Sequence, residues 1–393
     1  MSRTLDDLST PCVLVDEDVM QRNLRRMQER ADGWRVALRP HVKTHKSTQL
    51  AREQLRLGAS GLTVATVAEA EVFVRAGFSD VCIAYTVIGA DKLARIAAIA
   101  PKSRVSFCVD SEEGARQASE FFASRSAVAD VLVEVDTGHG RCGVRWDDAR
   151  LAGFFRFASS LPGLRIRGLL THAGQSYRGP SEGESKEDAL RRAASEERDR
   201  LLDAAVGLKE AGLLAAYERA SGRVGFDFVL SIGSTPSLAA FEPRSRQGMR
   251  VTEIRPGNYI FHDAMQVGLG SARLSDCALT VLAAVVSKRR DRLGSERVYL
   301  DAGKKVLTTD RGYDTDGFGV LLYNATTMTP LPHAHLVNLS EEHGWVEVAG
   351  GSTLEVGDRV RVVPNHACLV AATQSRLFRV RGDEVVGEVG VDG

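Results

Sequence analysis

Two histidines and two lysines are concentrated in one short stretch of this chain, Arg39-Pro40-His41-Val42-Lys43-Thr44-His45-Lys46. An apolar run over residues 36–38 precedes it and is typical of a β-strand, and a helical pattern begins near Ser47. Turns between a strand and a helix carry much of the chemistry of α/β proteins. A lysine in such a turn forms a Schiff base when its pKa is lowered and an aldehyde cofactor is held beside it. The alternative interpretation of the spacing alone is a solvated basic loop.

Two turns that contain glycine have the composition of phosphate-binding loops. The first is Gly233-Ser234-Thr235-Pro236-Ser237, which lies between an expected strand and a short helix. Small residues let backbone N–H groups approach a phosphate, and proline suits the first position of a helix. The second is Arg255-Pro256-Gly257-Asn258-Tyr259, at the next expected strand end. Because barrels commonly bind phosphate in the loops after strands seven and eight, the two turns together indicate a phosphorylated cofactor.

The segment 136–143, Asp-Thr-Gly-His-Gly-Arg-Cys-Gly, is rich in glycine and contains a single arginine, Arg141. One interpretation is a flexible loop with an arginine that faces solvent. The functional alternative is a guanidinium directed at a ring nitrogen or a carboxylate.

A candidate metal motif, Pro364-Asn365-His366-Ala367-Cys368, follows an expected strand over residues 359–363. Residues two apart in an extended segment share a face, so His366 and Cys368 can bind the same ion. An imidazole together with a thiolate favours zinc over magnesium or manganese. Two ligands are few, and such a motif by itself is more often a coincidence. The other histidine segments are Glu342-His343-Gly344 and the pair His333 and His335, of which the pair is expected at the ordinary protein surface.

Eight short β-rich runs, each followed by a helical pattern, must position these residues. The runs begin at Val36, Leu62, Val81, Val105, Val131, Ile166, Phe228 and Val251. Several are almost continuously apolar, as expected for strands that are buried on both faces of a parallel sheet. Eight such units over about 250 residues predict a TIM-type (β/α)8 barrel. A doubly wound open sheet is the alternative, but no GxGxxG follows the first strand.

A polar residue occupies the end of every one of these runs. In chain order the strand ends are marked by Lys43, Thr66, Tyr85, Asp110, the segment 136–141, His172, the segment 233–235 and Arg255. In a barrel all of these ends converge on the face that holds active sites. The pattern therefore predicts one site that is assembled from most of the strands.

Three helices can be assigned with a reason for each. After Asp16, which suits a helix N-cap, a stripe of Met20, Leu24, Met27 and Ala31 predicts a helix with one buried face. A capping box at residues 66–69 predicts another helix. The stretch 181–211 is rich in Glu, Arg, Lys and Ala, and we expect an exposed, charged helix there.

Beyond His262 the pattern changes to short β runs separated by turns. They cover residues 279–286, 298–300, 345–348, 360–363 and 377–380. We therefore expect a barrel over residues 12–262 and an antiparallel β domain over residues 263–393, which residues 1–11 can join.

Composition excludes several classes of function. The 393 residues contain 51 Lys and Arg against 51 Asp and Glu, so the charge balance favours neither nucleic acid nor an anionic membrane as a partner. The longest apolar run, residues 278–286, is too short to span a bilayer. The first residues lack the apolar core of a signal peptide, and the six cysteines form no CxxC motif. These features predict a cytoplasmic location.

Five segments together resemble one known family. They are 40–44, 171–174, 231–236, 342–344 and 364–368. The family is the group of D-serine dehydratase, D-threo-3-hydroxyaspartate dehydratase and D-threonine aldolase, among the alanine-racemase-like, fold type III pyridoxal-phosphate enzymes. The resemblance runs nearly from end to end. It implies a pyridoxal-phosphate barrel, a C-terminal β domain and a homodimer with active sites near the interface.

The resemblance also implies a role for individual residues. Lys43, in preference to Lys46, matches the lysine of the Schiff base, and Arg141 matches an arginine near the pyridine nitrogen. The phosphate cradle corresponds to Gly233, Ser234, Thr235, Gly257, Asn258 and Tyr259. His172 and Tyr177 match residues that line the cofactor. His366 and Cys368 match the metal ligands, which implies Zn2+, with Mn2+ or another divalent ion as the alternative.

The implied activity is dehydration of a β-hydroxy-D-amino acid, of the D-serine or D-threo-3-hydroxyaspartate type, to a 2-oxo acid and ammonia. Lys43 takes the α-proton, and the metal assists loss of the β-hydroxyl. The main alternative is metal-dependent cleavage to glycine and an aldehyde, as in D-threonine aldolase. In the resembling families aldolases tend to have Asp where this chain has Cys368, which favours dehydration.

Two other activities are disfavoured, and one specificity question stays open. A racemase needs a second base, usually a tyrosine early in the β domain, and residues 278–286 contain none. The β domain and the metal motif argue against a non-catalytic pyridoxal-phosphate-binding protein. Arg178, Arg223 and Arg311 are the candidates for recognising a second substrate carboxylate.

Overall fold

Eight parallel strands form the sheet at the centre of the first domain. This computed structural model describes residues 3–215, 228–290, 296–322 and 329–393. The strand order is β3 (Leu62–Val64), β4 (Asp80–Thr86), β5 (Arg104–Val109), β6 (Ala129–Asp136), β8 (Leu164–Leu170), β9 (Val229–Ile232), β12 (Glu253–Ile254) and β2 (Ala37–Leu38). A parallel bridge between His41 and Thr63 brings the two ends of this order together. The predicted (β/α)8 barrel is confirmed.

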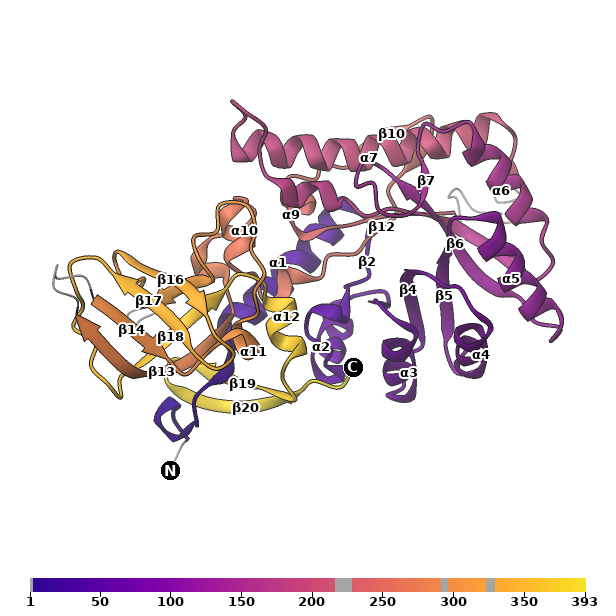
Figure 1. The fold of residues 1–393 in the computed structure, drawn as a ribbon. Helices are drawn as coiled ribbons and strands as arrows, with labels where there is room; N and C mark the ends of the chain where they lie inside the picture. Colours follow the sequence, from indigo (N-terminus) through magenta and orange to yellow (C-terminus); the bar gives the residue numbers. More distant parts are fainter. Residues whose placement is uncertain (1–2, 216–227, 291–295, 323–328) are drawn as a thin grey trace.

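Helices lie outside these strands (Figure 1). They are α1 (Glu17–Trp34), α2 (Thr48–Leu57), α3 (Val67–Arg75), α4 (Ala90–Ile99), α5 (Glu112–Ala123), α6 (Arg150–Ser160), α7 (Lys186–Glu210) and the short α9 (Thr235–Ala239). Within the described ranges, no helix combines the length and the apolar character that crossing a membrane requires.

The first helix forms for the reasons that the sequence gives. The side chain of Asp16 accepts a hydrogen bond from the Val19 N–H at 2.9 Å and so caps α1. The stripe of Met20, Leu24, Met27 and Ala31 is buried, as predicted. At α3 the Thr66 hydroxyl accepts from the Glu69 N–H at 3.1 Å. The Glu69 carboxylate accepts from Ala65 instead of completing the box, and it also pairs with Lys46.

The prediction of a solvated helix over residues 181–211 is wrong. Helix α7 packs against β9 and α9, and about half of its residues are buried against the rest of the protein. Its buried positions are Ala189, Leu190, Ala193, Ala194, Glu197, Arg198, Leu201, Leu202, Ala204, Ala205, Val206 and Leu208. Alanine side chains form a narrow apolar stripe, which the high density of charges on the remaining positions concealed.

The C-terminal domain is built on a second sheet, which is mostly antiparallel. Its strands are β13 (Leu279–Arg290), β14 (Glu296–Leu300), β15 (Gly319–Leu322), β16 (Ala334–Leu339), β17 (Gly344–Val348), β18 (Arg359–Pro364), β19 (Arg376–Arg381) and β20 (Glu384–Gly390). The sheet order is β16-β17-β14-β13-β1-β19-β20, and β18 pairs with both β13 and β15. The five runs expected from the sequence are present, whereas β15, β16 and β20 were not anticipated.

The strand β1 (Cys12–Asp16), from the beginning of the chain, lies in this second sheet. It is antiparallel to β13 and parallel to β19, with Leu14 opposite Thr280 and Phe378. The expected barrel range began at residue 12 and so included this strand, whereas the structure pairs the strand with the sheet of the C-terminal domain. The domain also contains the short helices α10 (Ala264–Gly268), α11 (Lys304–Leu307) and α12 (Ala367–Ala372).

Candidate active site

Lys43 lies in a single 3-10 turn that begins a few residues after β2. The turn, η2 (Val42–Thr44), is preceded by His41, whose Nδ1 accepts a hydrogen bond from the Lys43 N–H at 3.5 Å. Val42 and Thr44 are both fully buried. The backbone on either side of Lys43 is therefore held by packing, while its side chain extends into a cavity.

This cavity has a volume of about 220 Å³ and opens at the carboxyl ends of the barrel strands. It is lined by His41, Lys43, Ala65, Ala84, Tyr85, Thr86, Glu134, Arg141, Cys142, Leu170, His172 and Arg255. The structure thus brings Lys43, Arg141 and His172 to one place, from the ends of three different strands. A larger hollow of about 530 Å³ lies on the C-terminal domain beside Arg289 and Tyr299, and of the histidines named from the sequence only His335 lines it.

The cavity lowers the pKa of Lys43. Removal of the ammonium group from bulk water is the main cause, and the positive charges of Arg141 and Arg255 add to it, although Cys368 and Glu69 oppose the shift. Solvent reaches the side chain through the cavity mouth, but protein surrounds it on the other sides. A lower pKa leaves more of the amine neutral, which is the nucleophilic form that Schiff-base chemistry requires.

The two cavity histidines are neutral at ordinary pH. Burial, followed by the charge of Lys43, lowers the pKa of His172 to about 3 and that of His41 well below its usual value. Nδ1 of His172 lies 2.7 Å from the carbonyl oxygen of Gly233. Because a carbonyl only accepts, this nitrogen carries the proton and donates it, which leaves Nε2 as an acceptor.

Arg255 is the cavity residue whose role the sequence analysis missed. Its Nε donates to the Ser231 hydroxyl at 2.7 Å, and its Nη2 donates to the carbonyl of Thr171. The side chain is buried, whereas Arg141 is exposed on the loop after β6. The sequence showed Arg255 only as a polar residue at a strand end.

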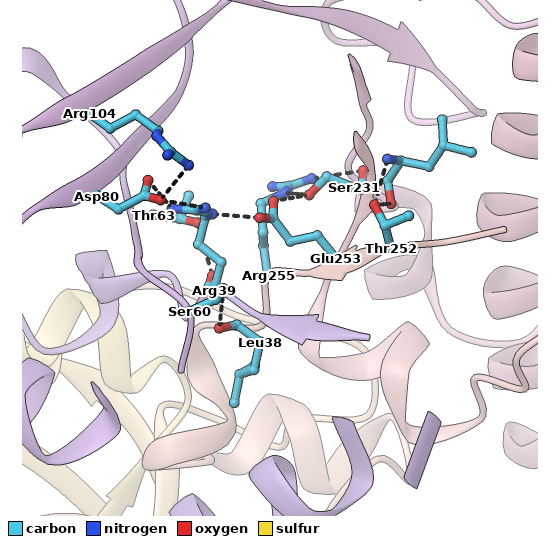
Figure 2. Close-up of polar contacts among 11 residues, drawn as sticks. Leu38, Arg39, Ser60, Thr63, Asp80, Arg104, Ser231, Thr252, Glu253 and Arg255 are labelled. Atoms are coloured by element: carbon cyan, nitrogen blue, oxygen red, sulfur yellow. Dashed lines mark hydrogen bonds and ion pairs between the residues drawn. The ribbon is translucent and has the colours of Figure 1, made fainter. Parts of the chain in front are cut away.

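A chain of buried polar contacts holds Arg255 from behind (Figure 2). The Ser231 hydroxyl donates to Glu253 at 2.7 Å, and Glu253 accepts from Nε of Arg39 at 2.6 Å. Arg39 also pairs with Asp80 at 2.7 Å. The guanidinium of Arg255, which lines the cavity, is thus held in place by residues in or next to strands β2, β4, β9 and β12.

The two glycine turns lie side by side and fit a group that carries several acceptor oxygens. Gly233 has φ +155°, and a Cβ there would lie 2.7 Å from the backbone nitrogen of Arg255. A Cβ on Gly257 would lie 2.7 Å from the hydroxyl of Thr44. The hydroxyl of Thr235 is buried and has no hydrogen-bond partner in the described structure. An orphaned donor beside backbone that tolerates no side chain is what a phosphate site needs.

Asn258 and Tyr259 contribute their backbone to the second turn, but their side chains are engaged elsewhere. Nδ2 of Asn258 donates to Asp263 at 2.5 Å, and the Tyr259 hydroxyl accepts from Gln54 at 3.0 Å. Tyr177 lies on the opposite side, in η3 (Gly174–Arg178). Burial raises its pKa, and the negative charges of Cys368 and Asp263 add to the shift, so its side chain faces the C-terminal domain.

Cys368 connects the C-terminal domain to the lysine turn. Its Sγ lies 3.3 Å from the hydroxyl of Thr44, the residue after Lys43. His366 is the N-cap of α12, and Cys368 lies in the first turn of that helix, so the expected extended geometry is wrong. The two side chains nevertheless interact with each other, and Nδ1 of His366 lies 2.7 Å from Asp310.

The surroundings of His366 favour a positive charge. Burial alone opposes it, but Cys368, Asp263 and Asp310 together raise the pKa of His366 to about 10. Across the described ranges, no group of three or more His, Cys, Asp and Glu side chains is arranged to hold one ion. His366 and Cys368 therefore stay a candidate pair of donors, with Asp310 behind the imidazole.

The remaining predicted residues lie apart from this constellation. His333, His335 and His343 are exposed. Arg178 donates to the carbonyl of His139 at 3.1 Å, and the guanidinium of Arg311 stacks over Phe318 at 4.3 Å. Arg223 lies outside the described residues.

A second residue that the sequence did not reveal is Glu197, in the middle of α7. Its Oε1 accepts from the N–H groups of Ala173 at 3.0 Å and Gly233 at 2.9 Å, and its Oε2 lies 2.7 Å from the Ser237 hydroxyl. The side chain is fully buried. Its only sequence signal is a carboxylate within the alanine stripe, and that signal becomes visible once the helix face is known.

Both domains match known families. Residues 15–264 match the alanine racemase N-terminal domain, and residues 278–380 match the serine dehydratase domain. D-threo-3-hydroxyaspartate dehydratase from Delftia sp. (strain HT23) is 34% identical over 95% of this chain and 94% of its own. D-threonine aldolase from Arthrobacter sp. is 36% identical over 97% and 91%. The solved structure of the Delftia dehydratase superimposes with a TM-score of 0.86 at 33% identity and covers 98% of both chains. A cysteine variant of that enzyme has been solved in a metal-free form.

Proposed function

Because this chain belongs to the alanine-racemase-like family of pyridoxal-phosphate enzymes, in the group of D-threo-3-hydroxyaspartate dehydratase and D-threonine aldolase, we propose that it is a dehydratase of a β-hydroxy-D-amino acid. The products are a 2-oxo acid and ammonia. The observation that carries this proposal is the contact between Cys368 and Thr44. It sets the donor pair of one domain against the lysine turn of the other, so a group for C–H chemistry and a group for C–O chemistry lie next to each other.

Pyridoxal phosphate fits the barrel end. When bound, it supplies an aldehyde that condenses with amines and a ring that withdraws electrons from the α-carbon of an amino acid. Lys43 would hold the aldehyde, and its Nζ would take the α-proton of the substrate. The two glycine turns receive the phosphate, and His172 and Tyr177 line the site.

Two arginines are available for the ring nitrogen and for the substrate. Arg141 keeps the role proposed from the sequence, pairing with the ring nitrogen or with a carboxylate. Arg255 is a second candidate for the ring nitrogen because it is buried and its orientation is fixed by Ser231 and Thr171. An arginine there leaves the nitrogen unprotonated and the ring a weaker electron sink, so loss of the β-hydroxyl gains from assistance.

His366 and Cys368 would hold a divalent metal, and the soft thiolate favours Zn2+ over Mn2+. Asp310 holds Nδ1 of His366 and leaves Nε2 for the ion, which is the usual arrangement behind a metal-binding histidine. Two protein ligands leave positions for water or for a substrate oxygen, as a catalytic site needs. The metal would supply Lewis acidity toward the β-hydroxyl.

Cleavage to glycine and an aldehyde is the second candidate. The similarity to D-threonine aldolase extends over the whole chain and supports it. The two reactions differ at the β-oxygen, because dehydration needs the oxygen to leave and cleavage needs it to lose a proton. Cys368, in place of the Asp that aldolases tend to have, is the feature that favours dehydration.

A homodimer and a cytoplasmic location are further parts of the proposal. All six cysteines are unpaired, which suits a reducing compartment. Light scattering of the purified protein tests the oligomeric state.

The reaction is tested by incubating the cofactor- and zinc-loaded protein with D-serine, D-threonine and D-threo-3-hydroxyaspartate. We expect ammonia and a 2-oxo acid in equal amounts from at least one of them. Glycine and an aldehyde would instead establish the aldolase activity. Neither product pair, from a protein that shows the visible absorbance of lysine-linked cofactor, would contradict both.

Replacing Asp310 with Asn is expected to weaken zinc binding by about 10- to 100-fold, because the imidazole loses the carboxylate that fixes its orientation. Competition with a chromophoric chelator measures the affinity. Asp316→Asn is the matched control, since Asp316 bonds the exposed His335 in the same way. Equal zinc affinity in the two variants would remove Asp310 from the metal site.

A further inference from the structure

The peptide of Gly233 is held from both sides by residues of other elements. Its N–H donates to Glu197 at 2.9 Å, and its carbonyl accepts from His172 at 2.7 Å. Glu197 also accepts from Ala173, the residue after His172. One carboxyl from α7 therefore ties the loop after β8 to the loop after β9. Gly233 contributes space to the turn, because its own N–H is already used.

Glu197 is buried and forms no salt bridge within the described ranges. Its direct partners are two backbone N–H groups and one serine hydroxyl, and among the described residues no lysine or arginine lies within ion-pair distance of it. Burial raises its pKa, although the bonds from Ser237 and Gly233, the positive charge of Arg255 and the bond from Ala173 oppose the shift. A buried, unpaired carboxylate is costly, and the neutral acid avoids that cost.

A row of hydroxyl groups runs from Glu197 to the first turn. Oε2 of Glu197 lies 2.7 Å from the Ser237 hydroxyl, which lies 2.9 Å from that of Ser234. Ser234 in turn lies 2.9 Å from Ser176, whose hydroxyl also donates to the Ala173 carbonyl at 2.7 Å. Each hydroxyl has one hydrogen, so the state of Glu197 sets the direction of the row.

The two directions leave Ser234 in different states. If Glu197 accepts, Ser237 gives its hydrogen to the carboxylate and Ser234 gives its own to Ser237. If Glu197 is the acid, it donates to Ser237, Ser237 donates to Ser234, and the hydrogen of Ser234 is released for another acceptor. Only the second direction offers the Ser234 hydroxyl to an incoming oxyanion.

We propose that Glu197 is a positioning residue for the cofactor phosphate, which fixes the Gly233 peptide and, as a neutral acid, turns the Ser234 hydroxyl toward the phosphate. The inference rests on the proposed function, because it places the cofactor phosphate at residues 233–235. It gives helix α7 a role in cofactor binding, because Glu197 positions groups of the first glycine turn from outside that turn.

The test compares pyridoxal phosphate with pyridoxal, which lacks the phosphate, on the full-length apoprotein. The visible absorbance of lysine-linked cofactor gives the affinity for each. Glu197→Ala is expected to weaken the binding of pyridoxal phosphate at least tenfold, because one or two hydrogen bonds are lost. The affinity for pyridoxal is expected to change less than about threefold. Glu197→Gln, whose amide can donate to Ser237 while its oxygen accepts both N–H groups, is expected to stay within about threefold of the wild type for both.

Two further variants keep the result interpretable. Ser237→Ala removes the hydroxyl that orients Ser234 toward the phosphate but spares both N–H bonds, so a smaller selective loss of pyridoxal phosphate affinity is expected even if Glu197→Ala folds poorly. Glu187→Gln, on the exposed face of the same helix, is expected to change neither affinity. Equal losses for both cofactors in Glu197→Ala and Ser237→Ala would overturn the inference. If Glu197→Gln bound pyridoxal phosphate as weakly as Glu197→Ala, the assignment of Glu197 as a neutral acid would be refuted. A wild type without lysine-linked absorbance would overturn the proposed function itself.

Discussion

Lys43→Ala is expected to lose lysine-linked cofactor completely and to lower the turnover of β-hydroxy-D-amino acids by at least about a thousandfold. The variant lacks both the amine that anchors the aldehyde and the base that takes the α-proton, and a positioned base alone contributes about 10²- to 10⁴-fold. The fold should survive, because the neighbours Val42 and Thr44 carry the packing of the turn. The measurements are the visible spectrum and the rate of oxo-acid formation.

Lys46→Ala is the matched control, since Lys46 lies in the same segment and is bound to Glu69 at 2.6 Å. It is expected to keep the spectrum and most of the activity. Reduction of the holoprotein with borohydride, followed by peptide mapping, identifies the modified lysine directly. A cofactor label on Lys46, or a normal spectrum in Lys43→Ala, would refute the assignment.

Acidification is expected to destabilise the protein steeply between about pH 6.5 and 4. Four histidines are held neutral, mainly because protein shields them from water: this lowers the pKa of His45 and His262 to about 4 and of His172 to about 3, and it lowers that of His41 well below its usual value. In the unfolded chain each of them takes up a proton near its ordinary pKa of about 6.5. The unfolded state therefore binds more protons in this window, and stability falls as the pH falls.

The contribution of His45 can be estimated because its environment is well defined. His45 has no exposed surface, its Nδ1 accepts from the Ser47 N–H at 3.0 Å, and its Nε2 lies 3.2 Å from Gln54. A shift of this size corresponds to about 3 kcal/mol of unfolding free energy, most of which is lost by about pH 4.

Urea unfolding between pH 8 and pH 4 measures the slope. His45→Gln is expected to reduce the loss over this range by about 3 kcal/mol relative to the wild type, since one buried neutral histidine is removed. His333→Gln, at an exposed site, is expected to leave the slope unchanged. A wild-type stability that is constant from pH 7 to pH 5 would contradict the prediction.

The barrel could be predicted because its signals are local. Continuous apolar runs mark strands, and the residue after each run falls at the same end of the barrel whatever the details of packing. Lys43, Arg141 and His172 were identified in that way, and the cavity brings them together. The stripe on α1 is equally local, because helical spacing alone decides which of its residues face inward.

The parts that escaped prediction depend on partners that are distant in the sequence. The fixed position of Arg255 follows from Ser231 and Thr171, and that of Glu197 from Ala173 and Gly233. The spacing of residues along the sequence does not predict contacts of this kind. The contact of Cys368 with Thr44 is of the same kind, because it needs the C-terminal domain to fold against the barrel.

The pairing of β1 has a consequence for how this chain is made. Leu14 is synthesised before the barrel, yet its neighbours Thr280 and Phe378 follow only after the whole barrel has been synthesised. During synthesis the backbone N–H and C=O groups of this apolar strand therefore lack their partners in the second sheet until the C-terminal domain has been made. A fragment that ends at the barrel would keep that strand exposed permanently, and we expect such a fragment to aggregate. Genetic separation of the two domains is therefore a poor route to an isolated barrel, whereas a fragment that begins after β1 avoids the unpaired strand.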